Sequence, residues 1–217
     1  IEQQLQEVVV QDQKSDQTIG IQRLKGIEGT AIYESKKSEV IIPNEIALNS
    51  ATNSARQLYA KVPGVQIWEG DEAGIQLNIG ARGLSPNRSS NFNIRQNGYD
   101  ISADALGYPE SYYTPPVEAI ERLEIVRGAA SLQYGPQFGG LVNFVLRRPD
   151  CSKKWQFHTR QTAGSFGLFN SFNALGGQVG PIAYYGYFQH KQGNGWRANS
   201  TYGLQNGFAS VEWKLHD

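Results

Sequence analysis

The sequence predicts an α+β module with short helices, followed by a meander of roughly four antiparallel strands. Two observations predict this fold class. The chain of 217 residues contains 24 Gly, and aromatic side chains make up 11% of it, a composition typical of β structure with many turns. Polar and apolar residues alternate near the end of the chain, whereas short helical and strand-like patterns are mixed before residue 150.

Composition divides the chain into three regions. Residues 1–25 are rich in Gln, Asp and Lys and contain one short apolar patch, which indicates a flexible tail. Residues 26–149 form the α+β module, and residues 150–217 hold the alternating strands. No apolar run approaches the ~20 residues that a membrane helix needs.

Within the module, short patterns of both kinds are bounded by Gly, Pro or Asn. Helical spacing occurs over residues 51–61, and Pro63-Gly64 ends that helix. Pro115-Pro116 opens a second short helix through Ile120, because Pro suits a first helical turn. Strand patterns cover Gly26–Tyr33, Gly64–Trp68, Gln76–Ile79, Phe92–Ile94, Leu123–Val126 and Leu141–Leu146.

The alternation after residue 154 fits two environments. Gly180-Pro181 forms a tight turn between two of the predicted strands, and Val211 and Trp213 alternate with polar residues in the last one. Such a sheet occurs in soluble sandwiches and in membrane barrels, where apolar residues face outward and polar residues face the lumen. Trp155 and Trp213, near strand ends, would suit the aromatic girdle of a barrel.

Several functional classes lack support in the composition. Lys and Arg number 20, as do Asp and Glu, so the chain has no basic excess for binding nucleic acid. Its single Cys and three distant His do not form a metal-ligand pattern, and we predict no cofactor or directly bound metal. A glycan hydrolase would need two facing carboxylates, but Asp71, Glu72 and Asp100 lack a supporting constellation, so we do not predict an enzyme.

Four segments, in this order and spacing, decide between the two environments. They are Ala55–Val65, Leu77–Leu84, Ile120–Gly128 and Tyr134–Phe144. Together they resemble the plug domain of TonB-dependent outer-membrane transporters. Gly80–Leu84, Tyr134–Gln137 and Gly195–Ser200 are most similar to the ferric-citrate receptor branch, whereas Arg95-Gln96-Asn97-Gly98 stands where most members carry Leu-Asp-Gly.

The resemblance implies a plug followed by the first roughly four strands of a transmembrane β-barrel. Barrels of this family have about 22 strands of roughly 9–11 residues, so we expect the chain to be incomplete. The implied location is the outer membrane of a Gram-negative bacterium, with the tail facing the periplasm.

The implied function is uptake of a ferric chelate, either ferric citrate or a siderophore, with iron as cargo. The implied partners are TonB with its inner-membrane energising complex, the ferric chelate and outer-membrane lipid. Two alternatives remain open: import of another chelate such as cobalamin, and a soluble β-rich binding or adhesion protein.

The apolar patch of the tail resembles the family's TonB box. It consists of Leu5, Gln6, Glu7, Val8, Val9 and Val10. A β-branched, extended segment with solvated flanks can add as a strand to a partner's sheet. The alternative is an ordinary edge strand packed on the module.

Two arginines that precede glycines, Arg82 and Arg127, resemble the plug side of an ionic lock between plug and barrel. We expect Glu121, Glu124 or acidic residues of the barrel as their partners. The alternative is a pair of solvated surface ion pairs, each worth ~0–1 kcal/mol.

Three plug loops are implied to face the outside and to bind the chelate. They are Trp68–Gly74, Ser85–Asn91 and Ser102–Tyr113. Trp68 lies in the first, and Asn87 and Arg88 in the second suit an anionic chelate. The third contains tyrosines suited to stacking and hydrogen bonding, namely Tyr108, Tyr112 and Tyr113. Ordinary surface loops are the alternative.

Overall fold

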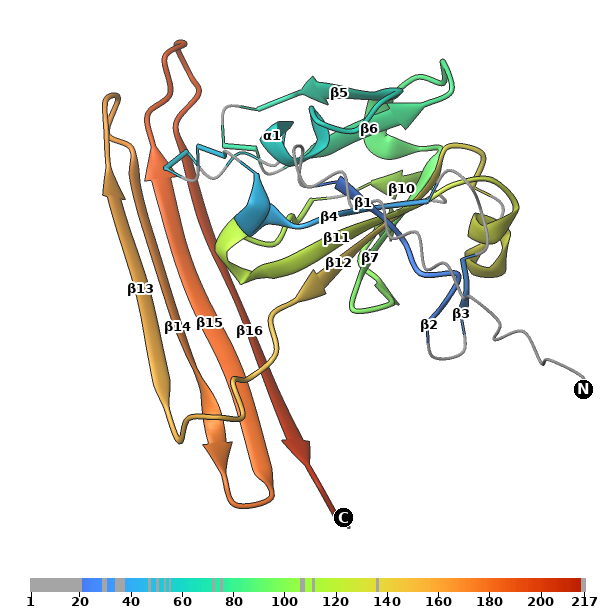
Figure 1. The fold of residues 1–217 in the computed structure, drawn as a ribbon. Helices are drawn as coiled ribbons and strands as arrows, with labels where there is room; N and C mark the ends of the chain where they lie inside the picture. The colour runs from blue at the N-terminus through green and yellow to red at the C-terminus, as the bar shows by residue number, and fades with distance from the viewer. Residues whose placement is uncertain are drawn as a thin grey trace, which may run out of the picture.

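The computed structural model describes residues 21–215, except 29–30, 34–37, 47, 50, 53, 55, 72, 75, 106–107, 111 and 136. A six-stranded mixed sheet lies beside a four-stranded antiparallel sheet that rises along one side of it (Figure 1). We call the four-stranded sheet, strands β13 to β16, the wall sheet. No helix in the described ranges is both long and apolar enough to cross a membrane.

The six-stranded sheet forms the centre of the module. Its strands, in spatial order, are β1 (Ile21–Arg23), β4 (Glu39–Ile41), β11 (Ile120–Val126), β12 (Gly140–Leu146), β7 (Phe92–Gln96) and β8 (Tyr99–Asp100). All neighbours are antiparallel except β12 and β7, which are parallel. Every residue of β12 is buried, which explains why its sequence is almost continuously apolar.

Smaller elements surround this sheet. Three two-stranded ribbons pair β2 (Ile27–Glu28) with β3 (Ala31–Ile32), β5 (Val65–Glu69) with β6 (Leu77–Ala81), and β9 (Ala103–Ala105) with β10 (Tyr108–Glu110). The helices among the described residues are α1 (Arg56–Tyr59) and four 3₁₀ segments, η1 (Pro43–Glu45), η2 (Asn87–Ser89), η3 (Val117–Ala119) and η4 (Gly128–Tyr134).

The wall sheet is a meander of long strands. They are β13 (Gln156–Ala163), β14 (Phe169–Val179), β15 (Ile182–Gly193) and β16 (Tyr202–Trp213), with 8, 11, 12 and 12 residues. Gly180 and Pro181 connect β14 to β15, because Val179 pairs directly with Ile182. Three of these strands reach the ~9–11 residues that a tilted transmembrane strand needs.

The two faces of the wall sheet differ in their surroundings. Phe172, Ala174, Tyr185 and Tyr187 point toward the module and share one buried core with residues such as Phe144. The opposite face exposes large apolar side chains. Examples are Phe157, Leu175, Ile182, Phe188, Val211 and Trp213. The wall sheet therefore packs on the module with one face and presents an apolar surface with the other, the alternation expected of barrel strands.

These elements confirm the predicted fold class of an α+β module followed by antiparallel strands, but several details differ. The helix expected over 51–61 is a single turn, Arg56–Tyr59. Among the described residues of that range only Leu58 and Tyr59 reach the core, and so short an apolar stripe cannot support a longer helix. The strand expected over Gly26–Tyr33 is a ribbon of two short strands. The short helix expected from Pro115-Pro116 through Ile120 is one 3₁₀ turn, Val117–Ala119.

The regional boundaries at residues 25 and 149 stay predictions. Ile21–Arg23 form β1 and pair with β4, although the sequence places them in the tail. The second boundary falls between Leu146, where β12 ends, and Gln156, where β13 begins.

Candidate functional site

The turn after β6 brings the chain back against its own strand. A Cβ on Gly80 would lie 2.6 Å from the carbonyl oxygen of Leu84 and 2.9 Å from the nitrogen of Pro86, so only glycine lets this loop fold back so closely. Arg82 and Gly83 follow with φ of 59° and 73°, which reverses the chain. The backbone of the Gly80–Leu84 segment thus makes a tight reversal that brings η2 against β6.

Hydrogen bonds hold η2 on β6 and bring two predicted ligand loops together. The backbone N–H of Arg88 donates to Oδ1 of Asn78 (3.1 Å), and Asn78 is the cross-strand partner of Trp68. The Ser89 hydroxyl accepts from the N–H of Ile79 (3.0 Å). The Trp68, Asn87 and Arg88 side chains are all exposed on this part of the surface.

The third predicted ligand loop divides into two parts. Strand β10, which contains Tyr108, lies against η2, so its backbone joins the other two loops. Tyr112 is half exposed. Tyr113 contacts the wall sheet instead, and its hydroxyl shares a hydrogen bond of 2.7 Å with that of Tyr187. Burial raises the pKa of the Tyr113 phenol, while the hydrogen bond to Tyr187 acts in the opposite direction.

The ion pairs of the module differ from those expected for the two lock arginines. Arg127 donates to Glu39 (3.0 Å), and Arg82 is exposed. The carboxylates of Glu121 and Glu124 lie 3.3 Å and 2.8 Å from the Arg122 guanidinium. Within the described residues these two acids are therefore partners of Arg122, and a lock that involves Arg82 and Arg127 stays a prediction.

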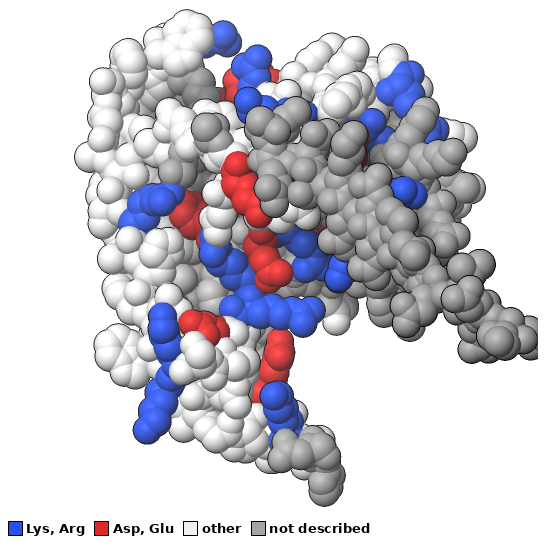
Figure 2. Space-filling model, viewed as in Figure 1, with Lys and Arg blue, Asp and Glu red and all other residues white. Residues whose placement is uncertain are grey.

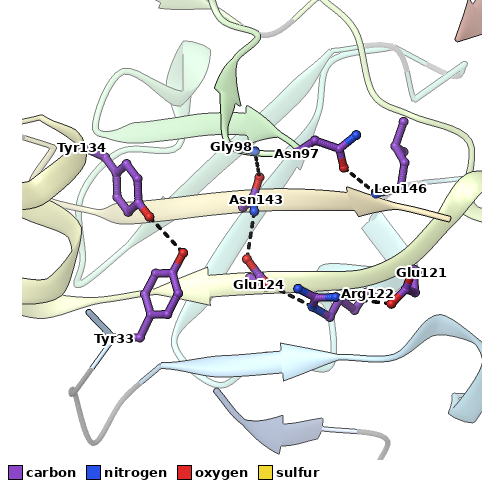
Figure 3. Close-up of polar contacts among 9 residues, drawn as sticks. All are labelled: Tyr33, Asn97, Gly98, Glu121, Arg122, Glu124, Tyr134, Asn143 and Leu146. Carbon is purple, nitrogen blue, oxygen red and sulfur yellow. Dashed lines mark hydrogen bonds and ion pairs between the residues drawn. The ribbon is translucent and has the colours of Figure 1, made fainter. Parts of the chain in front are cut away.

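Figure 3 shows a polar network that extends from Arg122 through Glu124 to Asn143. The sequence analysis did not predict this network. Glu124 accepts from the side-chain amide of Asn143 (2.8 Å), and Asn143 Oδ1 accepts from the N–H of Gly98 (2.9 Å). Asn97 Oδ1 accepts from the N–H of Leu146 (2.9 Å). The one signal for this network is a polar Asn143 inside an apolar strand, since a buried amide needs partners. Asn97, the departure from the family's usual turn, bonds inside the module.

Polar side chains also cross from the module to the wall sheet. Charged residues of both signs gather where the two meet, as Figure 2 shows. Glu118 on η3 is buried and lies 3.5 Å from the guanidinium of Arg160 on β13. Its own carbonyl accepts from Arg147 Nε (2.6 Å). Lys191 on β15 donates to the carbonyl of Ala73 (2.6 Å). The sequence-based prediction named none of these contacts.

An open cavity of about 320 Å³ lies between the β5–β6 ribbon and two wall loops. It is lined by Glu69 at the end of β5, by Asp71 of the loop that follows, and by Phe166, Trp196 and Arg197 from the wall loops. The Arg197 guanidinium lies 4.3 Å from the centre of the Trp196 ring. The sequence analysis singled out Gly195–Ser200 by resemblance. Only the fold shows that this loop and Phe166 line the same cavity.

The predicted TonB box, Leu5 to Val10, lies outside the described ranges and stays a prediction. Within those ranges, no group of three or more His, Cys, Asp or Glu side chains could hold a metal ion.

Comparison with known proteins decides the family. The family model described as TonB-dependent Receptor Plug Domain matches residues 31–141, just over half of the chain. The chain belongs to the TonB-dependent receptor plug family. This plug is 29% identical over 137 residues to the ferric enterobactin receptor PirA of Pseudomonas aeruginosa, an alignment that covers 56% of this chain and 18% of that receptor.

Solved structures of two transporters share the fold. The ferric citrate transporter FecA in its unliganded form has a TM-score of 0.64 at 22% identity, over 83% of this chain and 29% of FecA. The copper transporter OprC has a TM-score of 0.63 at 20% identity, over 83% of this chain and 28% of OprC. The matched region thus spans less than a third of these proteins.

Family membership confirms three predictions. The chain is a plug with the first strands of a wall, it is not an enzyme, and its location is the outer membrane of Gram-negative bacteria. The alternative of a soluble adhesion protein is therefore wrong. Hereafter the module is called the plug.

Proposed function

We propose that this chain is the plug and first wall strands of a transporter that imports a ferric chelate across the outer membrane. One observation carries the proposal: the plug covers one face of a sheet whose other face is apolar. Such a sheet suits a lipid-embedded wall, and a plug on its inner face closes the pore. Outer-membrane lipid is then the partner of the exposed apolar face.

Exposed side chains on the plug and on one wall loop would suit an anionic ligand. Arg88 of the plug and Arg197 of the β15–β16 loop provide guanidinium groups, and Trp68 and Trp196 of the same two parts provide exposed aromatic surface. Guanidinium groups bind carboxylates and other planar anions with two hydrogen bonds, and aromatic rings pack on flat ligands. A ferric complex of citrate or of a siderophore combines these properties. Iron would travel as part of this cargo, and we propose no resident cofactor.

Energy for transport would come from TonB through the tail. We propose that Val8 to Val10 add as a strand to a sheet of TonB. The tail leads directly into β1, a three-residue strand at the edge of the six-stranded sheet. A pull on the tail would therefore act first on a three-residue strand whose described strand partner is β4.

A transport assay in the full-length receptor tests this proposal. Val9→Pro removes a backbone donor and should abolish TonB-driven uptake of an iron-55 chelate while leaving binding to cells unchanged. Gln13→Pro, in the same tail but outside the predicted box, is the control and should transport normally. Normal uptake by Val9→Pro at a normal membrane level would reject the role of the box.

A ligand panel tests the cargo. We expect receptor-dependent uptake of ferric citrate or of a ferric siderophore and none of cobalamin. Uptake of cobalamin alone would overturn the ferric assignment, although it would leave the transport mechanism intact.

A further inference from the structure

We propose that Lys191, a buried lysine of the wall sheet, is a positioning residue that latches the β5–β6 loop of the plug, residues 70–76, to the wall. The inference rests on the proposed function, because this loop belongs to the outer surface where the chelate would bind. It assigns to the wall a part in shaping the ligand site.

The latch is a hydrogen bond between a buried side chain and a buried backbone group. Lys191 is 2% exposed and Ala73 is 3% exposed. The Lys191 ammonium donates to the Ala73 carbonyl at 2.6 Å, across 118 positions of sequence. Because the acceptor is a main-chain carbonyl, this contact depends on where the loop backbone lies and not on which side chain it carries.

The wall is built to hold this lysine in place. Gly193 is the cross-strand partner of Tyr202, and a Cβ at Gly193 would lie 2.7 Å from the Tyr202 hydroxyl oxygen. The absence of a side chain at Gly193 therefore lets the tyrosine fold over the strand. The centre of the Tyr202 ring lies 5.9 Å from Lys191 Nζ, within the range of a cation–π contact.

The charge of Lys191 explains why its buried ammonium needs hydrogen-bonding and electrostatic partners. A buried ammonium without partners is strongly disfavoured, whereas an apolar residue would fill the same wall position without that cost. The carboxylates of Asp71 and Glu118 add electrostatic attraction to the ammonium. Asp71 also stiffens the loop, because its Oδ2 accepts from the N–H of Gln76 (2.8 Å). The loop thus supplies both a carbonyl and a nearby carboxylate.

The latch should influence ligand affinity more than transport rate. The loop joins β5 to β6, and through Asn78 on β6 it connects to Trp68 and to the backbone of Arg88. Release of the loop from the wall would free these ligand-facing residues to move. We expect Lys191→Met to raise the KM for uptake severalfold and to leave the maximal rate near that of the wild type.

Cysteine labelling measures the latch directly in the full-length receptor in intact cells. Ala73→Cys serves as the reporter, in a Cys151→Ser background that removes the exposed native thiol. A membrane-impermeant maleimide should react slowly with the buried thiol while Lys191 is present. Lys191→Met should speed labelling by about 10- to 100-fold, the factor expected for loss of one hydrogen bond to a charged group.

Two further variants make the test decisive. Gln192→Met, the next residue on the opposite and exposed face, should leave labelling unchanged. Lys191→Gln keeps a donor on a shorter side chain and should give an intermediate rate, and it replaces Lys191→Met if that variant fails to insert. Labelling of Ala73→Cys at the same rate in all inserted variants would overturn the latch. Since labelling requires neither ligand nor TonB, this result is independent of the transport proposal.

Discussion

Asn143→Ala should loosen the centre of the plug, because Asn143 bridges two strands and a turn. The substitution removes the donor to Glu124 (2.8 Å) and the acceptor for the N–H of Gly98 (2.9 Å). Asn143 is 8% exposed and Glu124 is 2% exposed, so water replaces neither partner readily. A hydrogen bond to a charged group contributes about 1.5–3 kcal/mol and a neutral one about 1 kcal/mol, which gives a combined loss of about 2.5–4 kcal/mol.

Hydrogen exchange of the purified full-length receptor measures this loss. Amides in residues 92–100 and 140–146 should exchange roughly 10²- to 10³-fold faster than in the wild type, the factor that corresponds to this free energy of local opening. Gln66→Ala, at an exposed position of β5, is the matched control and should change nothing. Exchange within a few fold of the wild type at both segments would refute the assignment of Asn143 as the bridge.

Two further substitutions test the outer turn and the lipid-facing surface. Gly80→Ala should cost about 1–3 kcal/mol and speed exchange around Leu84, because a Cβ would press on its carbonyl, whereas Gly203→Ala meets open space and should be neutral. Phe188→Lys should reduce the amount of inserted receptor, since a lysine on the lipid face costs about 2–4 kcal/mol near the bilayer centre. Gln192→Lys is the control and should insert nearly normally. Equal insertion of both variants would contradict the proposed lipid contact.

Strand positions were predictable where side chains follow a local period. The apolar runs at β11 and β12 and the alternation of the wall strands depend on which face each residue presents, and the sequence shows this directly. The expected helix over 51–61 was too long because local propensity does not reveal how many of its residues reach the core. The structure supports only the turn of α1.

Contacts between distant segments were not predictable in the same way. Glu118 with Arg160, and Lys191 with Ala73, depend on how the wall sheet is placed against the plug, which no local period encodes. Glu124, one of the expected partners of Arg127, lies against Arg122, because alternation along β11 places Arg122 and Glu124 on the same face. Motif resemblance predicts the positions of the ligand loops, which stay a prediction, and the structure adds that Tyr113 contacts the wall.

The outward face of the wall sheet also indicates which end of the molecule faces outside. Cross-strand partners form rows, and two rows differ sharply in polarity. The row nearer the Gly180-Pro181 turn is Phe157, Leu175, Gly186 and Ala209, and the row farther from it is Gln161, Ser171, His190 and Gln205. Barrels have short turns on the periplasmic side and longer loops outside, so the apolar row belongs to the lipid and the polar row to the outer rim. The loop of Trp196 and Arg197 lies at that rim. Along β15, Lys191 lies between the polar row and this loop. The proposed latch would therefore lie where the wall leaves the bilayer, at the level of the proposed ligand site rather than in the lipid-embedded part.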